Sequence, residues 1–347
     1  MKFSSKIKFK NFELSNNSKT FIIAEAGVNH DGSLEKAYKL VDVAVKANVN
    51  AIKFQAFHTN KLIKRNVEKP NYQVKNLQNR NINQFDMLKK LEISKEQNRK
   101  LINYCKKNKI NFISTPYDDD SLKELLDLGV DTIKIASTDL TNISFIRKIA
   151  KSKKNIILSS GMSYMSEVNL AVKEISKYNQ KLILLQCTSD YPTANKEAAI
   201  SVVPKFKKKF NCLVGFSDHT KGTGASPYAV CLGAKVIEKH FTLNKKDVGP
   251  DHKASLSPRE LFSLVKEIRK IENYLEMKIK KPTKSELNSR KFLQKNLVAA
   301  NKIKKGSIFN EKNITCMRTG GKGFSALKYY DFIGKKAKRD YKQFEEI

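Results

Sequence analysis

Short β-branched runs alternate with longer amphipathic stretches along most of the chain, and this alternation is typical of βα units that build a parallel sheet. Apolar residues at helical spacing predict helices over residues 34–47, 95–107 and 259–275. The strand-like runs begin near Phe21, Ala51, Asn111, Thr132, Ile156, Leu182, Leu213 and Val236. Eight such runs with helices between them predict a (β/α)8 TIM barrel from about residue 21 to residue 275.

The C-terminal part of the chain has a different pattern. Residues 278–291 are polar and lysine-rich with a single proline, which predicts a linker. Fully extended at about 3.3 Å per residue, this linker would reach roughly 46 Å. Residues 292–347 contain short runs interrupted by KKG and GGKG turns, as expected of a compact, mostly-β unit. We therefore expect a barrel domain over residues 1–277, the linker, and a small domain without an active site of its own.

The composition narrows the class of protein. The 347-residue chain carries a formal net charge of +33, but its lysines are spread over the whole length. No helix-turn-helix, RNA-recognition or zinc-finger pattern accompanies them, so we expect no nucleic-acid partner. No apolar run reaches about 18 residues and the N-terminus has no secretory signal, so we expect no membrane association and a cytoplasmic location. The five cysteines never form a CxxC pair, which predicts reduced thiols at packing positions.

Barrel enzymes carry their chemistry at the C-terminal ends of the strands, and polar side chains stand at every predicted strand end here. They are Glu25 with Asn29 and His30, Lys53 with Gln55, Thr115, Lys134 with Ser137, Ser159, Ser189 with Tyr191, Ser217 with Asp218 and His219, and Glu238 with His240. The pattern predicts a polar site at this end of the barrel.

Two histidines end neighbouring predicted strands. His219 ends the seventh strand and His240 the eighth, and neutral imidazoles on adjacent strands can share one divalent ion. A single histidine is more often a structural residue. Two of the chain's five histidines at adjacent strand ends favour a metal site instead.

Two lysines lie inside apolar strands, where a buried ammonium requires an anionic partner. They are Lys53 and Lys134, and the nearby hydroxyls would complete a cradle for a phosphate and a carboxylate. Two alternatives remain open. The lysines could extend out of the barrel end to solvent, or Lys134 could be the Schiff-base nucleophile of a metal-independent aldolase.

The motifs that contain these residues resemble those of the N-acetylneuraminate (sialic acid) synthase family, which includes legionaminate synthases. In the family's order they are IIAEAGVNHDGS, KFQAF, STPYDDDS, KIAS, ILSSGM, CTSDYPT, VGFSDHT, IEKHFTL and GPDHKASL. The tail resembles the family's antifreeze-like (SAF, β-clip) domain. The resemblance implies a transferase that joins phosphoenolpyruvate to N-acetylmannosamine, or to the related 2,4-diacetamido-2,4,6-trideoxymannose, and makes a nonulosonic acid for surface glycans. The alternative that it leaves open is an N,N'-diacetyllegionaminate or pseudaminate synthase.

The resemblance also implies residue roles. Glu25, Lys53 and Lys134 would be catalytic, and His219 and His240 would bind Mn2+, or Mg2+ or another divalent ion. The residues implied to contact phosphoenolpyruvate are Lys53, Thr115, Lys134, Ser137, Ser159, Ser189 and Ser217. Those implied to contact the sugar are Gln55, Asp139, Tyr191, Asp251 and Arg318. In this family the arginine at the position of Arg318 reaches the partner subunit's active site, which implies a domain-swapped homodimer.

The chain departs from the family pattern at two places, and three alternatives remain open. STD at residues 137–139 stands where SGE is usual, and RTGG at residues 318–321 replaces the common RPG. Glu25 could merely pair with Lys53. The enzyme could act on a phosphorylated sugar, which would require further basic residues near the sugar's tail. A barrel without activity could bind sugar phosphates or nucleic acid. The sequence leaves the choice of amino sugar open.

Overall fold

A computed structural model describes residues 1–69 and 83–347. The chain divides into two compact units, Met1–Glu276 and Met277–Ile347, so the division falls one residue before the predicted end of the barrel domain. Each unit has a hydrophobic core of its own. Among the described residues, no helix is both long and apolar enough to span a membrane.

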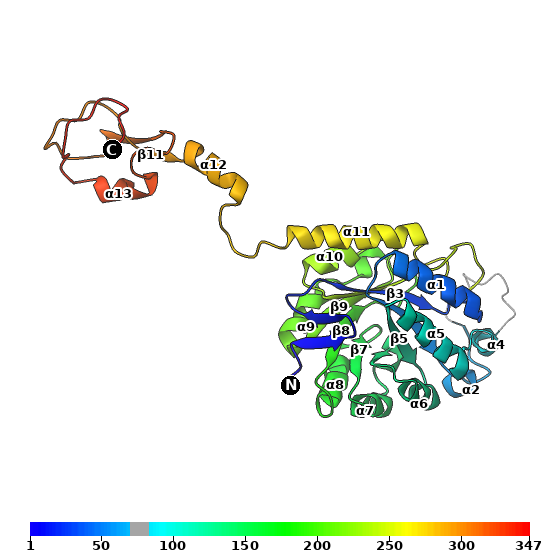
Figure 1. The fold of residues 1–347 in the computed structure, drawn as a ribbon. Helices are drawn as coiled ribbons and strands as arrows, with labels where there is room; N and C mark the ends of the chain where they lie inside the picture. Colours follow the sequence, from blue (N-terminus) through cyan, green and yellow to red (C-terminus); the bar gives the residue numbers. More distant parts are fainter. Residues whose placement is uncertain (70–82) are drawn as a thin grey trace. The chain divides into compact units, whose positions relative to one another are not determined.

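The first unit is built around a closed barrel of parallel strands in the order β10-β3-β4-β5-β6-β7-β8-β9 (Figure 1). The strands are β3 (Phe21–Gly27), β4 (Ala51–Ala56), β5 (Asn111–Pro116), β6 (Thr132–Ile135), β7 (Asn155–Ser159), β8 (Leu182–Cys187), β9 (Leu213–Asp218) and β10 (Val236–His240). Each begins within one residue of its predicted start. The predicted (β/α)8 barrel is therefore confirmed.

Helices cover the outside of the barrel (Figure 1). They are α1 (Leu34–Lys46), α2 (Thr59–Leu62), α4 (Gln84–Lys89), α5 (Lys95–Lys107), α6 (Asp119–Asp127), α7 (Ile143–Lys151), α8 (Met165–Ser176), α9 (Val202–Phe210), α10 (Ser226–Cys231) and α11 (Pro258–Tyr274). Local sequence fixes several starts: Ser94 and Ser257 each form a capping box with the residue three positions later. The three helices predicted from periodicity, at α1, α5 and α11, lie within one residue of their expected bounds.

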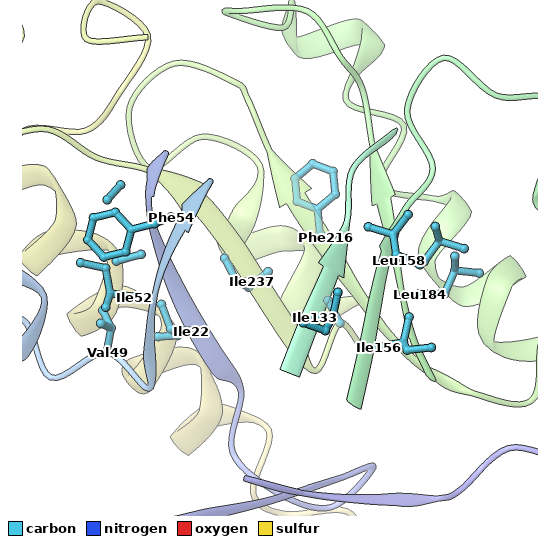
Figure 2. Packing of buried hydrophobic residues seen from close by; sticks show 14 of the residues in the cluster. Ile22, Val49, Ile52, Phe54, Ile133, Ile156, Leu158, Leu184, Phe216 and Ile237 are labelled. Atoms are coloured by element: carbon cyan, nitrogen blue, oxygen red, sulfur yellow. The ribbon is translucent and has the colours of Figure 1, made fainter. Parts of the chain in front are cut away.

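The main core lies between the strands and these helices. Figure 2 shows the strand side chains that face this layer, such as Ile52, Leu184 and Ile237. Because successive side chains of a strand point to opposite faces, the remaining strand residues point into the barrel. The interior therefore receives every second residue of each strand.

The N-terminal residues close one end of the barrel, a feature that we did not predict. Strands β1 (Lys6–Phe9) and β2 (Phe12–Ser15) form an antiparallel hairpin. Its side chains Ile7, Phe9 and Leu14 pack on the apolar interior residues at the N-terminal ends of the barrel strands. The rings of Phe9 and Phe21 stack with their centroids 4.1 Å apart. The hairpin thus seals the end of the barrel opposite the predicted site.

The second unit contains α12 (Lys284–Leu293), β11 (Lys295–Ala299), β12 (Ile314–Arg318) and α13 (Tyr329–Phe332). Strands β11 and β12 pair antiparallel, and the predicted small, mostly-β unit is confirmed in this form. Residues 284–291 of the predicted linker belong to α12, which a capping box of Thr283 and Glu286 starts. Even if the six residues before α12 were fully extended, eight helical residues would limit residues 278–291 to at most about 32 Å rather than 46 Å.

Candidate active site

The C-terminal ends of the barrel strands surround a cavity of about 430 Å³. Nearly all of the predicted site residues line it: Glu25, Lys53, Gln55, Thr115, Lys134, Ser137, Ser159, Ser189, Tyr191, Ser217, His219, His240 and Asp251. They come from all eight strands or the loops that follow them. The barrel closure brings residues 226 positions apart in the sequence into one cavity.

Four buried ionisable side chains form the floor of the cavity. Lys53 Nζ lies 2.5 Å from Glu25 Oε2 and 3.8 Å from Glu238 Oε2, and Lys134 Nζ lies 3.5 Å from Glu238 Oε1. Each of these side chains is at most 6% exposed. Buried charges are tolerated only when paired, and two ammonium groups here face two carboxyl groups. We refer to these four residues as the ionic cluster.

The two carboxyl groups of the ionic cluster have different protonation properties. Burial raises the pKa of Glu25 to about 7, against the opposing effect of Lys53 and with a further contribution from Glu238. Burial acts on Glu238 too, but Lys134, Lys53 and the Ser217 hydroxyl outweigh it and lower the pKa of Glu238. Near neutral pH Glu238 is therefore ionised, whereas Glu25 can accept or release a proton.

The two lysines differ as well. Burial opposes the charged form of both, but Glu238 and Glu25 together raise the pKa of Lys53. Lys134 lies farther from the carboxylates, and burial lowers its pKa despite Glu238. Lys53 is thus held as a cation by the ionic cluster itself. Lys134 is the cation that gains most from an added anion.

Hydroxyl groups surround the lysines, as predicted. Lys53 Nζ donates to Thr115 Oγ1 at 3.1 Å, and Ser217 Oγ donates to Glu238 Oε1 at 3.0 Å. The buried Ser159 hydroxyl has no hydrogen-bond partner within the described chain. A glycine is required beside Ser137 and Ser189, because a Cβ on Gly161 would lie 2.2 Å from the Ser189 hydroxyl oxygen. The hydroxyls are arranged to bind an anion between the two lysines.

The two predicted metal-binding histidines lie side by side at the cavity wall. Their ring centroids are 5.5 Å apart, and the ring of Tyr191 lies against both. Nδ1 of His219 is 2.7 Å from the carbonyl oxygen of Thr188, which can only accept, so Nδ1 carries the proton and Nε2 is available as a ligand. Nδ1 of His240 is buried without a hydrogen-bond partner in the described residues.

The electrostatics of the histidine pair favour a neutral His240. Burial, His219 and the nearby lysines lower its pKa well below the ordinary value, so that the imidazole is in the form that binds metals. The carboxylate of Asp251 lies 4.0 Å from His240 Nδ1, and burial raises the pKa of Asp251 to about 6. Burial opposes the charged form of His219, but Cys187, the Thr188 carbonyl and Glu238 raise its pKa, so an ion held by the two imidazoles would displace a proton from His219. With that proton released, the two imidazoles fit a divalent ion.

Of the predicted sugar-contacting residues in the first unit, Asp139 does not line the cavity. Asp139 is buried beside β6 and accepts a hydrogen bond from Asn142 Nδ2 at 3.1 Å. It is the last residue of the short 3-10 helix Ser137–Asp139, whose first two residues line the cavity. Arg318 is an exposed residue at the end of β12, in the second unit. Gln55, Tyr191 and Asp251 are the predicted sugar-contacting residues that the cavity contains.

The cavity also contains residues whose role the sequence analysis missed. Glu238 stands at a predicted strand end without a predicted role. It lies two residues from both Val236 and His240, so all three side chains point to the same side of β10, into the barrel. Cys187 was expected only to pack, yet it lines the cavity, with its Sγ 3.8 Å from His219 Nδ1. Apolar side chains also line the cavity, and six of them pack in one cluster: Val28, Phe57, Leu62, Met87, Leu88 and Tyr117. We call these residues the apolar wall.

A closed βα barrel with buried lysines, hydroxyls and a histidine pair at its C-terminal end defines an enzyme class that handles anionic substrates. The profile of the NeuB family matches residues 40–280. The chain is 43% identical over 332 residues to N,N'-diacetyllegionaminic acid synthase of Campylobacter jejuni, covering 95% of this chain and 99% of that protein. It is 32% identical to human N-acetylneuraminate-9-phosphate synthase over 91% of this chain and 88% of that protein.

A solved structure agrees with these relatives. The crystal structure of N-acetylneuraminic acid (sialic acid) synthetase from Leptospira borgpetersenii in complex with citrate superposes with a TM-score of 0.74 at 34% identity, covering 84% of this chain and 98% of that one. The chain belongs to the NeuB family, and it is a synthase of the sialic-acid type. The predicted resemblance is thereby confirmed.

Proposed function

We propose that the enzyme condenses phosphoenolpyruvate with the open-chain aldehyde of an N-acetylated amino sugar and releases phosphate. The observation that carries this proposal is that two buried lysines, Lys53 and Lys134, line one cavity together with several hydroxyl groups and two histidines. A phosphate and a carboxylate on one small molecule match two ammonium groups and several hydroxyl donors. C3 of phosphoenolpyruvate attacks the aldehyde carbon, water adds at C2, and phosphate leaves by cleavage of its C–O bond.

The charge balance supports a divalent ion at His219 and His240. The two lysines of the ionic cluster already face two carboxyl groups, so the floor alone offers little net positive charge to a polyanionic substrate. A Mn2+, Mg2+ or similar ion held by the two imidazoles would add that charge, and it would polarise the aldehyde oxygen as a Lewis acid. Gel-filtered protein treated with a chelator should lose turnover, and added Mn2+ should restore it.

Glu25 is the candidate proton acceptor for the water that adds at C2. Its pKa of about 7 matches a base that works near neutral pH, where such a group typically contributes about 10²- to 10⁴-fold to the rate. The ion pair with Lys53 also fits the simpler interpretation that Glu25 only neutralises the lysine. Replacement by glutamine tests the proposal, because loss of a base should slow the reaction by about 10²- to 10⁴-fold and remove the limb of the pH–rate profile near pH 7.

Lys134 acts as a fixed cation in this scheme. Its lowered pKa is a property that Schiff-base lysines share, so the aldolase alternative has some support of its own. Borohydride distinguishes the two functions. A synthase should keep its activity after borohydride treatment with substrate present, whereas an aldolase would be inactivated and would carry a reduced adduct on Lys134.

The lining of the cavity favours an unphosphorylated sugar. Among its described lining residues, the lysines and arginines are Lys53 and Lys134, both in the ionic cluster, so apart from the proposed Arg318 this lining offers no further cation for a phosphate on the sugar's tail. The apolar wall suits methyl groups better than hydroxyls, since a buried hydroxyl without a partner is costly. We therefore propose 2,4-diacetamido-2,4,6-trideoxymannose as the preferred sugar, ahead of N-acetylmannosamine.

The similarity to N,N'-diacetyllegionaminic acid synthase supports the same choice. Purified enzyme with phosphoenolpyruvate and Mn2+ should be assayed with each of the two sugars and with N-acetylmannosamine 6-phosphate. We expect the highest kcat/KM for the diacetamido sugar. A higher kcat/KM for N-acetylmannosamine would overturn the choice of sugar. A higher kcat/KM for the phosphorylated sugar would overturn the inference that the substrate is unphosphorylated.

We further propose that Arg318 completes the active site of a second subunit in a homodimer. The described residues that line the cavity belong to the first unit, whereas Arg318 is exposed in the second unit and follows a segment that could reach at most about 32 Å. Arg318→Ala and Glu25→Ala should each be nearly inactive alone. Mixed under subunit exchange, they should regain activity, because one site of the heterodimer then holds both intact residues. Verified exchange without recovery would contradict the proposal.

A further inference from the structure

A buried ion pair lies directly behind the two histidines. Asp218 and Lys239 each precede a histidine by one residue, and Lys239 Nζ lies 2.9 Å from Asp218 Oδ2. Their side chains are 0% and 3% exposed. Neither residue lines the cavity. A substrate in the cavity therefore does not contact the pair, and the pair can influence the site only through neighbouring residues.

The geometry of the strands connects the pair to the histidines. Asp218 and Lys239 are directly paired between β9 and β10. Successive side chains of a strand point to opposite faces, so His219 and His240 point to the cavity while Asp218 and Lys239 point to the helix layer. An attraction between the latter two therefore fixes the relative position of the strand ends from which the histidines emerge.

Hydrogen bonds tie the pair to the residues that follow His219. Lys239 Nζ donates to the carbonyl oxygen of Thr220 at 2.8 Å. The Asp218 carboxylate accepts hydrogen bonds from the backbone N–H and the hydroxyl of Thr220, at 2.8 and 2.6 Å, and from those of Ser226, at 3.0 and 2.6 Å. A Cβ on Gly224 would lie 1.9 Å from Thr220 Oγ1, so the turn closes tightly on the carboxylate. His219 is thus held between two anchored residues.

Stability alone does not account for this arrangement. Burying two charges is costly, and well-packed neutral replacements of a buried ion pair are often no less stable. A geometric role explains why a charged pair occupies this position.

We propose that Asp218 and Lys239 are positioning residues that set the spacing of His219 and His240 and thereby the affinity of the site for a divalent ion. The inference rests on the proposed function to the extent that the two histidines bind such an ion. Partners that orient metal-binding residues typically change the affinity by about 10- to 100-fold when they are replaced.

The test is a titration of the full-length protein with Mn2+. The electron paramagnetic resonance signal of the free ion measures how much Mn2+ remains unbound. The double variant Asp218→Asn with Lys239→Met removes both charges together. We expect its Kd for Mn2+ to rise about 10- to 100-fold while binding of phosphoenolpyruvate without metal stays unchanged. The matched control is Lys245→Met with Glu260→Gln, which removes a partly exposed pair 3.1 Å apart on the segment after β10 and keeps the capping box.

Each outcome of this titration decides a question. A folded double variant that binds Mn2+ like the wild type overturns the inference and leaves the proposed function intact. Wild-type protein that takes up no Mn2+, or His240→Ala protein that takes it up equally well, overturns both. If the double variant does not fold, Ser226→Ala removes the 2.6 Å hydrogen bond that the Ser226 hydroxyl donates to Asp218 Oδ2. We then expect a weaker rise in Kd for Mn2+, and an unchanged Kd overturns the inference.

Discussion

The two ends of the barrel differ in what the same eight strands place in the interior. At the N-terminal ends the inward residues are apolar, among them Phe21, Leu213 and Val236, and the β1–β2 hairpin covers them. At the C-terminal ends the inward residues two or four positions later are Glu25, Ser217 and Glu238. The first end contributes hydrophobic burial, whereas the second end buries charges that cost stability and can act on a substrate.

This difference separates stability from activity along each strand. A substitution at the hairpin end should change the free energy of unfolding and leave catalysis alone, and one at the cavity end should do the reverse. The four predictions below test this separation, in order of decreasing effect.

Lys134→Met should lower kcat/KM by about 10²- to 10³-fold, because one preorganised cation for the substrate anion is lost. The free energy of unfolding should change by less than about 1 kcal/mol, since burial already works against this charge and Glu238 keeps Lys53 and Ser217 as partners. Steady-state kinetics and urea unfolding measure the two quantities. A variant that is much less stable, with kcat/KM unchanged, would contradict the separation.

Leu14→Ala should destabilise the protein by about 2–5 kcal/mol, because Leu14 is fully buried between the hairpin and the barrel. The kcat/KM of the remaining folded protein should stay within about twofold, since the cavity is at the other end. Leu170→Ala on α8 is the matched control, because this leucine is exposed and its loss should cost less than about 0.5 kcal/mol. Equal effects of both variants on urea unfolding would show that the hairpin does not stabilise the barrel.

The pH dependence should report Glu25. A base with a pKa of about 7 is ionised above that pH, so kcat/KM should fall about tenfold per pH unit as the pH drops below 7. Glu25→Gln should be slow and should lack this limb. Because the pKa of Glu25 in the folded protein lies above its ordinary value of 4.5, its contribution to stability is present below about pH 4.5 and is lost as the pH rises through 7. Glu25→Gln should therefore also flatten the stability profile in this window.

Asp139→Asn should have the smallest effect. Its carboxyl group contacts Asn142 and does not line the cavity, so we expect kcat/KM with the sugar to change by less than about twofold, or about 0.4 kcal/mol. The measurement is a comparison of KM for the sugar in the two proteins. A large rise in KM would show that Asp139 contacts the sugar, as the family resemblance implied.

The sequence predicted the barrel and most of its site for a simple physical reason. Strand alternation places every second residue inside, and parallel strands bring their C-terminal ends to the same end of the barrel. Lys53, Lys134 and His240 could thus be assigned to one cavity without coordinates. The alternation also pointed to Glu238, two residues before His240, and could have predicted its role. The family resemblance supplied the chemical roles, which periodicity cannot provide.

Local sequence alone determined the barrel and its strand ends, since both follow from patterns within single strands and helices. Tertiary structure decided the rest, because those features depend on contacts between distant residues. The apolar side chains of Ile7 and Leu14 in the hairpin are buried only because the end of the barrel packs against them. The pKa of Glu25 depends on Lys53 and Glu238 from two other strands. The turn that directs Asp139 away from the cavity, and the contact of Asp218 with Lys239, likewise exist only after the strands have assembled.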